Sequence, residues 1–311
     1  MRVLSLFSGI GAPEYAWRNL PFTFVGQSEI DPFASAVLDH HYPAVQNFGD
    51  INNYEKWQLP ATPSLIVGGS PCQPFSIANG GLQRGLADPR GNLALVFLAV
   101  IQRYSPEWLL FENVPGILSS GGKGRDFGTF LSALGELGYW WAYRLLDSRY
   151  HGVWQRRKRL YLIGHRRKWQ YPAAVLFDRE SCSGDIAQSK RAGKNTASLA
   201  ESSTGATMYE NHPNDSRIKV TDIGPTVTRR WGSGGGNTPL ILQDGKVRRI
   251  LAVEAEKMMG FAPGYSAIQY PKDKIASDSR RFMALGNSMC VPLITHLAKR
   301  IMTVNEIDRS L

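Results

Sequence analysis

The residue best suited to covalent chemistry is Cys72, which stands between Pro71 and Pro74 in the stretch GGSPCQPFS. The apolar run SLIVGG that precedes it is typical of a buried strand. Because proline fits poorly inside a central strand, we expect the thiol at a strand end, facing a ligand cleft. As a thiolate it would be a strong nucleophile. The alternative is a buried core cysteine, the usual state of a free thiol.

Two other segments carry charged groups that folding could bring to this thiol. ENV, residues 112–114, closes an apolar run with the carboxyl group of Glu112. The basic run QRRKR, residues 155–159, supplies guanidinium groups that would favour a thiolate. A cysteine–histidine pair of the protease kind is the competing arrangement, but the six histidines show no recognisable signature for it.

A small-molecule site is indicated by FSGIG, residues 7–11, where an apolar run leads into a glycine turn and a helix-like segment. Such a turn lets a nucleotide-like ligand approach the backbone at a helix N-terminus. Glu29 ends the next apolar run, about 20 residues on, where an acidic residue suits ribose hydroxyls. The alternatives are an ordinary glycine turn and an acidic helix cap, although Asp31 already fits the capping role. The absence of a GxxxxGK(S/T) motif argues against a nucleotide triphosphatase.

These residues need a sheet to position them, and the first 165 residues alternate between strand and helix patterns. We expect strands at 2–7, 22–30, 64–69, 107–114, 140–147 and 159–165. We expect helices at 11–20, 31–42, 91–104 and 125–137. The alternation predicts an α/β sheet with helices on both faces, and it puts Glu29, Cys72 and Glu112 at strand ends.

The pattern changes from about Arg166 to Val247, where Ser, Thr, Asn and Gly dominate. This composition predicts a second, small and irregular domain. Apolar residues at helical spacing return at 248–261 and at 291–301. The expected division is a first domain at 1–165, a second domain at 166–247, and a segment at 248–311 that returns to the first.

Bulk composition limits the classes of function. The 311 residues are 43% hydrophobic, enough for a packed core, and no run of about 18 apolar residues could span a membrane. The N-terminus lacks the features of a signal peptide. The net charge of +10 fits a nucleic-acid partner, although a membrane surface or a merely basic protein fits it too. Cys72, Cys182 and Cys290 lack metal-ligand spacing, so we expect a reducing compartment and neither disulfides nor a metal.

Together these motifs resemble those of the cytosine-5 DNA methyltransferases, in family order and from end to end except in the variable middle. The matching segments are FSGIG, SEID, FGDI, SPCQPFS, ENVPG, GVWQRRKRLYLIG, RRILAVEAEKMMGF and LGNSMCVPLITHLAKRI. The resemblance implies a Rossmann-like S-adenosylmethionine-dependent methyltransferase sheet, with a small target-recognition domain at 166–247. Ala12, Trp154 and Ala252 depart from the residues that are frequent in the family at these positions.

The resemblance also implies a site for S-adenosylmethionine, with S-adenosylhomocysteine as the product and no metal. Glu29 is the residue expected on the ribose, and Asp50 is the one expected at the adenine amino group. The residues expected at the cofactor are Phe7, Gly9, Gly11, Glu29, Ile30, Asp50, Ile51, Pro71, Leu93, Asn287 and Ser288.

By the same resemblance, the Cys72 thiolate would attack carbon 6 of a cytosine flipped out of the duplex, and carbon 5 would take up the methyl group. Protonated Glu112 would donate to ring N3, and Asn113 would help to hold the base. Arg159, together with Arg157, would contact the base carbonyl or the phosphate and favour the thiolate.

A further segment resembles the Thr-Leu-containing part of target-recognition domains. This is GPTVTRRWGSGGGNTPLIL, with Val227 in the leucine position. The residues expected to contact DNA are Gln73, Ser76, Gln155, Thr226, Thr228, Arg229 and Arg230. The two arginines either read bases or bind phosphates, and the sequence does not indicate which DNA sequence is recognised.

The expected partner is double-stranded DNA, and a cognate restriction endonuclease is a further candidate. The protein is expected to be a monomer in the cytoplasm of a bacterium or a phage-infected host. One competing function is a tRNA cytosine-5 methyltransferase of the same fold, which the motifs do not exclude. Another is an inactive DNA-binding relative, against which the presence of Cys72, Glu112 and Arg159 argues. Cys182 and Cys290 are interpreted as structural residues.

Overall fold

The computed structural model describes the chain over residues 1–70, 93–120, 125–177, 207–212, 215–221, 223–233, 238–271 and 274–310. Four residues with expected roles, Pro71, Cys72, Gln73 and Ser76, lie outside these ranges, as does Cys182. What the sequence predicts for them therefore stays a prediction. Within the described ranges, no helix is both long enough and apolar enough to cross a membrane.

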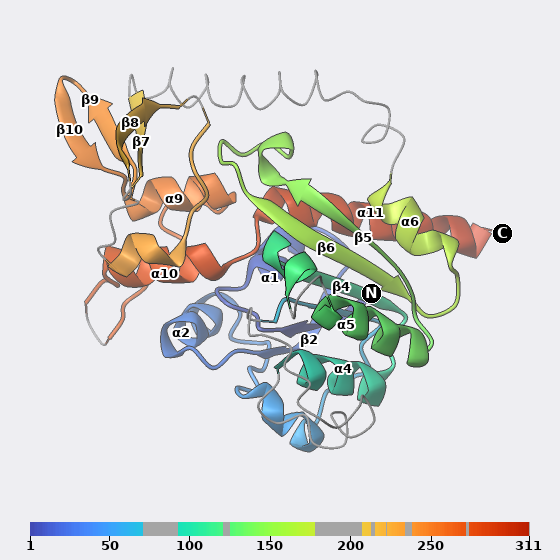
Figure 1. The fold of residues 1–311 in the computed structure, drawn as a ribbon. Coiled ribbons are helices and arrows are strands. Elements are labelled where there is room, and N and C mark those ends of the chain that lie inside the picture. The colour runs from blue at the N-terminus through green and yellow to red at the C-terminus, as the bar shows by residue number, and fades with distance from the viewer. Residues whose placement is uncertain are drawn as a thin grey trace.

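A six-stranded sheet with the order β2-β1-β3-β4-β6-β5 forms the centre of the molecule (Figure 1). The strands are β1 (Arg2–Leu6), β2 (Thr23–Ser28), β3 (Leu65–Gly68), β4 (Trp108–Asn113), β5 (Trp140–Asp147) and β6 (Lys158–His165). β1 to β4 are parallel, whereas β6 runs antiparallel to both β4 and β5. The predicted α/β class is confirmed, and a strand lies in each range where one was expected.

Helices cover both faces of this sheet because alternate side chains of each strand point to opposite sides. Val3 and Val67 belong to a core cluster with α1 (Ala12–Trp17), α2 (Pro32–His41), α6 (Gln170–Leu176) and α11 (Val291–Ser310). Leu4 and Ile66 belong to the opposite cluster with η1 (Ile51–Lys56), α4 (Leu93–Tyr104) and α5 (Arg125–Glu136). The short helices η2 (Pro115–Ser119) and η3 (Ser148–Tyr150) follow β4 and β5.

The C-terminal helix α11 returns to the first sheet, as expected for the last segment. The indole Nε1 of Trp17 on α1 donates to the Ile294 carbonyl at 3.0 Å. Helix α6 falls within 166–247, but it packs against β5, β6 and α11. This packing argues against a domain boundary at residue 166. We propose that the first domain extends through α6.

A second, four-stranded antiparallel sheet with the order β10-β9-β7-β8 lies in the region expected to be irregular. Its strands are β7 (Thr207–His212), β8 (Asp215–Val220), β9 (Leu240–Gln243) and β10 (Lys246–Arg249). Figure 1 shows it at one end of the molecule, beside α9 (Ala252–Met259) and α10 (Asp278–Asn287). Met208 and Ile241 of this sheet join the core cluster of the first face, so the two sheets share a core.

Candidate active site and cofactor cavity

The turn after β1 follows an unusual backbone path. Phe7, Gly9 and Gly11 have φ angles of 52°, 55° and 79°, in the left-handed region that favours glycine. A Cβ on Gly9 would have no heavy atom within 4 Å, so this glycine leaves open space beside the backbone. A Cβ on Gly11 would lie 2.7 Å from the ring of Tyr42. Gly11 is thus needed for packing; it is not among the residues that line the cavity described below, and its expected contact with the cofactor stays a prediction.

The carboxylate of Glu29 holds the glycine turn from the end of β2. Its Oε2 accepts the backbone N–H of Gly9 at 2.8 Å. Its Oε1 accepts the N–H groups of Ile30 and Asp31 at 2.9 and 2.8 Å. Asp31 in turn caps α2, as the sequence predicts, by accepting the N–H groups of Phe33 and Ala34. Glu29 therefore fixes two loops as well as presenting a carboxylate to the space between them.

Asn47 is a residue of this site that the sequence reasoning missed. Its Oδ1 accepts the N–H groups of Glu29 and Gly49, each at 3.0 Å. Its Nδ2 donates to the Glu29 carbonyl at 3.2 Å. Asn47 thereby ties the end of β2 to the loop that carries Asp50, which caps η1 through Asn52. The signal available in the sequence was its place three residues before Asp50, in NFGD.

A cavity of about 500 Å³ opens at the carboxyl ends of β1 to β4. This volume lies within the usual range for small-molecule sites. Expected cofactor residues that line it are Phe7, Gly9, Glu29, Ile30, Asp50, Ile51, Leu93 and Asn287. Expected catalytic residues that line it are Glu112, Asn113, Arg157 and Arg159. The cavity therefore brings together the residues expected at the cofactor and the residues expected to be catalytic.

Glu112 and Arg159 form a shielded ion pair in this cavity. Glu112 Oε1 lies 3.3 Å from Arg159 Nε, and the two side chains are 13% and 14% exposed. Burial raises the pKa of Glu112 above its ordinary value, while the positive charges of Arg159 and Arg157 oppose that rise. The pocket thus holds a carboxyl group whose protonated form is favoured by burial, beside a fixed guanidinium.

The side-chain amide of Asn113 forms hydrogen bonds with backbone groups, one of them close in sequence to the predicted nucleophile. Its Nδ2 donates to the Ser70 carbonyl at 3.1 Å, and its Oδ1 accepts the N–H of Val114 at 2.8 Å. Ser70 is the last described residue before Cys72. Asn113 therefore fixes the exit of the chain from β3, and its expected contact with a base stays a prediction.

Arg157 differs from its expected role as a contact to the base or the phosphate. Its side chain is buried, and its guanidinium donates to three backbone carbonyls, those of Val227, Gly286 and Ser288, at 2.9, 3.2 and 2.7 Å. Burial and the neighbouring Arg159 lower its pKa to about 10. Arg157 thus joins the loop after β8 to the turn that presents Asn287 to the cavity.

Gln155 is also placed differently from its expected contact with DNA. It is fully buried, its Nε2 donates to the Met258 carbonyl at 2.6 Å, and its Oε1 accepts the N–H of Val227 at 3.2 Å. The hydroxyl of Thr226 donates to the Arg156 carbonyl. These contacts hold the segment that contains Val227 against α9 and leave Gln155 no exposed surface for DNA.

The remaining expected residues lie around the cavity rather than inside it. Ser288 is buried and lines a small adjoining cavity of about 30 Å³ with Gly9 and Asn287. Arg229 and Arg230 begin η4 (Arg229–Ser233), and both are exposed. The described residues contain no group of three or more His, Cys, Asp or Glu side chains arranged to hold a metal.

Comparison with known proteins identifies the family. The sequence profile of the family described as C-5 cytosine-specific DNA methylase matches residues 1–222. The chain belongs to this family.

Individual methylases are similar to different extents. The orphan methyltransferase M.SPRI of Bacillus phage SPR is 42% identical over 170 residues, which are 53% of this chain and 38% of that protein. The type II methyltransferase M.NlaX of Neisseria lactamica is 29% identical over 318 residues, which are 96% of each chain. The crystal structure of S. pombe Dnmt2 methyltransferase has the same fold, with a TM-score of 0.68 at 20% identity over 97% of this chain and 98% of that one. The chain spans less than two thirds of several curated relatives.

Replacing Glu29 by alanine is expected to weaken binding of S-adenosylhomocysteine by about ten- to a hundredfold, because the acceptor expected for the ribose would be lost and Gly9 loses its anchor. Isothermal calorimetry measures the dissociation constant. Glu55→Ala, which removes an exposed carboxylate from η1, is the control and should leave it unchanged. An unaltered dissociation constant for the Glu29 variant would remove this residue from the site.

Replacing Arg157 by methionine is expected to lower the free energy of unfolding by about 2–4 kcal/mol, because two buried carbonyls and one partly buried carbonyl lose their donor. Urea unfolding followed by circular dichroism measures the loss. The neighbouring Arg156→Met removes a half-exposed ion pair with Glu210 and should cost less than about 1 kcal/mol. Equal losses in the two variants would show that Arg157 does not stabilise the fold through these carbonyls.

Proposed function

We propose that this protein transfers a methyl group from S-adenosylmethionine to carbon 5 of a cytosine in a specific DNA sequence. The observation that supports this most is a single cavity lined by Glu29 and Asp50 at one side and by Glu112 and Arg159 at the other. Membership of the C-5 cytosine-specific DNA methylase family supports the base and the type of reaction.

The residues present fit the cofactor. The carboxylates of Glu29 and Asp50 suit ribose hydroxyls and an adenine amino group, and the open faces of Gly9 and Gly49 leave room beside the backbone. When bound, S-adenosylmethionine would supply an electrophilic methyl group and leave as S-adenosylhomocysteine. Asn287, at the end of α10, would close this site from the side of the second sheet.

The remaining chemistry would fall to side chains of this chain. The Cys72 thiolate would form a bond to carbon 6 of the cytosine, and Glu112 in its protonated form would give its proton to ring N3. Electron density would thereby reach carbon 5, which is otherwise a poor nucleophile. After methylation, water would take up the carbon 5 proton, the sulfur–carbon bond would break, and the N3 proton would return to Glu112, which restores the ring and the thiolate. The target atom of a base stacked in a duplex is out of reach of an enzyme's side chains, so the cytosine would be flipped out.

Arg159 would serve this reaction by its charge. Its guanidinium lies against Glu112, where it would also stabilise a thiolate brought to the cavity by the segment after Ser70. Removal of this charge would favour the thiol over the thiolate and raise the pKa of Glu112 further.

The partner would be double-stranded DNA, contacted by the second sheet and the loops around it. The names of the relatives include both orphan and type II methyltransferases, so they favour neither a solitary enzyme nor a pair with a restriction endonuclease. The monomeric state and the cytoplasmic location expected from the sequence stay predictions.

The test is to incubate the purified protein with methyl-labelled S-adenosylmethionine and either DNA or tRNA, and to identify the modified nucleoside by mass spectrometry. We expect 5-methyldeoxycytidine in DNA, and bisulfite sequencing of that DNA would give the recognised sequence. Label in tRNA alone would favour the RNA alternative. Sequence-selective DNA binding without any label would favour an inactive relative.

A further inference from the structure

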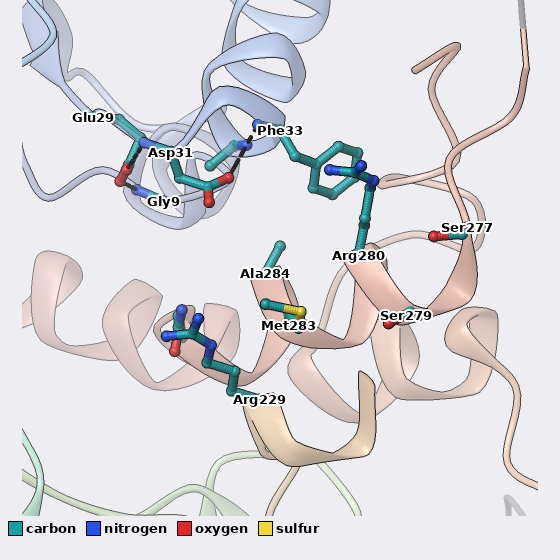
Figure 2. Close-up of a pocket in the computed structure, with 12 residues that line it drawn as sticks. Gly9, Glu29, Asp31, Phe33, Arg229, Ser277, Ser279, Arg280, Met283 and Ala284 are labelled. Carbon is teal, nitrogen blue, oxygen red and sulfur yellow. Dashed lines mark hydrogen bonds between the residues drawn. The ribbon is translucent and has the colours of Figure 1, made fainter. Parts of the chain in front are cut away.

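A groove adjoins the cofactor cavity on the side of α10. Its volume is about 470 Å³, and it shares Gly9, Glu29 and Asn287 with that cavity. One wall comes from the end of β2 and the start of α2, and the other comes from α10 and η4. Figure 2 shows Glu29, Asp31 and Phe33 facing Arg229, Met283 and Arg280 across this space. None of the expected cofactor contacts requires the outer part of the groove.

The wall formed by α10 is a single stripe of that helix. Arg280, Met283, Ala284 and Asn287 line the groove at positions i, i+3, i+4 and i+7, which share one helix face. Seven residues of helix span roughly 10 Å. This length equals that of about three nucleotides of one DNA strand, which rises by about 3.4 Å per nucleotide. The stripe therefore has a cation at its outer end, apolar side chains in its middle and the cofactor cavity at its inner end.

Arg229 adds a second cation at the inner end of this stripe. The backbone of Thr228 and Arg229 packs directly on Gly286, where a Cβ would collide with it. Ser279 donates from its hydroxyl to the Gly232 carbonyl, so η4 is held against α10 at both ends. Figure 2 shows Met283 and Ala284 lying between Arg229 and Arg280. The backbone of the two arginines is thus held at opposite ends of one groove, although they are far apart in the sequence.

The guanidinium groups of both arginines are available to a ligand. Both side chains are exposed, and within the described part of the chain neither has a hydrogen-bond or ion-pair partner. The guanidinium carbon of Arg280 lies 5.2 Å from the centroid of the Tyr270 ring, over its face. On the facing wall, Glu29 accepts three backbone N–H groups, whereas Asp31 is exposed and accepts two through Oδ1 alone. The groove therefore offers donors to an anion, and guanidinium groups suit phosphate and carboxylate oxygens.

We propose that this groove binds oxyanions of the substrate, namely phosphates of the DNA strand that delivers the cytosine, with Arg280 and Arg229 as the contacts. The proposal rests on the proposed function, because it takes DNA as the substrate. Arg280 is a new residue in this role, and the proposal gives Arg229 a phosphate rather than a base to contact. The α-carboxylate of S-adenosylmethionine is the other oxyanion that could reach the groove, since the groove opens into the cofactor cavity.

DNA binding at several salt concentrations tests the phosphate contacts. Fluorescence anisotropy with two duplexes of unrelated sequence, in the presence of S-adenosylhomocysteine, gives the dissociation constants. Arg280→Gln and Arg229→Gln are each expected to weaken binding to both duplexes by about tenfold and to make the plot of log K against log salt shallower by about 0.9. Arg280→Lys should keep the slope, and Arg125→Gln, an exposed residue of α5 outside the groove, should change nothing.

A second measurement separates the two sources of oxyanion. The affinities of S-adenosylhomocysteine and of 5′-methylthioadenosine, which lacks the carboxylate, are measured for the same variants without DNA. We expect neither affinity to change. A loss for S-adenosylhomocysteine alone, an unchanged salt slope, or a loss confined to one duplex sequence would each overturn the assignment to DNA phosphates. Because these readouts are binding constants, a wild-type protein that binds DNA but transfers no methyl group would contradict the proposed function and leave the groove assignment standing.

Discussion

Replacing Cys72 by alanine is expected to abolish methyl transfer, lowering the rate by about 10⁴-fold or more, because the proposed bond to carbon 6 would lose its nucleophile. Transfer of tritium from labelled S-adenosylmethionine to DNA measures the rate. Cys72→Ser should be nearly as inactive, since a hydroxyl is a much weaker nucleophile than a thiolate at neutral pH. The alanine substitution is small, and circular dichroism should show an intact fold.

The matched control for this variant is Cys182→Ala, which removes another thiol from the polar middle region. It should keep the wild-type rate, because that cysteine was interpreted as structural. DNA binding and S-adenosylhomocysteine binding should be preserved in both variants. Substantial methylation by the Cys72→Ala variant would rule out the covalent mechanism.

Replacing Glu112 by glutamine is expected to lower the rate by about 10²- to 10⁴-fold, the usual contribution of a general acid. Glutamine keeps the size and a hydrogen-bond donor, but it cannot give a proton to ring N3. Single-turnover methylation under saturating DNA and cofactor measures this step without contributions from product release. Glu107→Gln is the control, because Glu107 lies just before the same strand, at the end away from the cavity, and it should leave the rate unchanged.

The pH profile gives a second readout for Glu112. Burial raises the pKa of this carboxyl group, so its protonated, proton-donating form persists to a higher pH than for an exposed glutamic acid. The wild-type rate should therefore fall as pH rises through the pKa of Glu112, while formation of the Cys72 thiolate raises the rate with pH at the acid side. The glutamine variant should lose the fall on the alkaline side. An identical alkaline limb in the two proteins would mean that Glu112 is not the acid.

The first sheet could be predicted because its signals are local. Each of its strands contains a short apolar stretch, and Asp31 before Pro32 marks the start of α2. The second sheet could not be predicted from local signals, because β9 and β10 are four residues long and β7 carries polar residues. Short polar strands give no periodicity that distinguishes them from loops.

The same distinction explains which parts of the site were predicted. Glu29 and Glu112 were placed correctly at strand ends, where the geometry of a parallel sheet gathers side chains. The buried positions of Arg157 and Gln155 were not predicted, because a polar residue in a motif suggests an exposed contact. Their partners are backbone carbonyls and N–H groups, including those of Val227, and the sequence cannot show which distant backbone groups will need a donor.

The most direct test of the central claim is covalent capture with DNA that contains 5-fluorocytosine at the recognised position. With fluorine in place of hydrogen, carbon 5 has no proton to lose, so the sulfur–carbon bond cannot break after methyl transfer. In the presence of S-adenosylmethionine, the wild-type protein should form a complex that survives a denaturing gel, and the Cys72→Ala variant should form none. A wild-type protein that methylates ordinary DNA but gives no such complex, or an alanine variant that is captured as well, would contradict a covalent mechanism through Cys72.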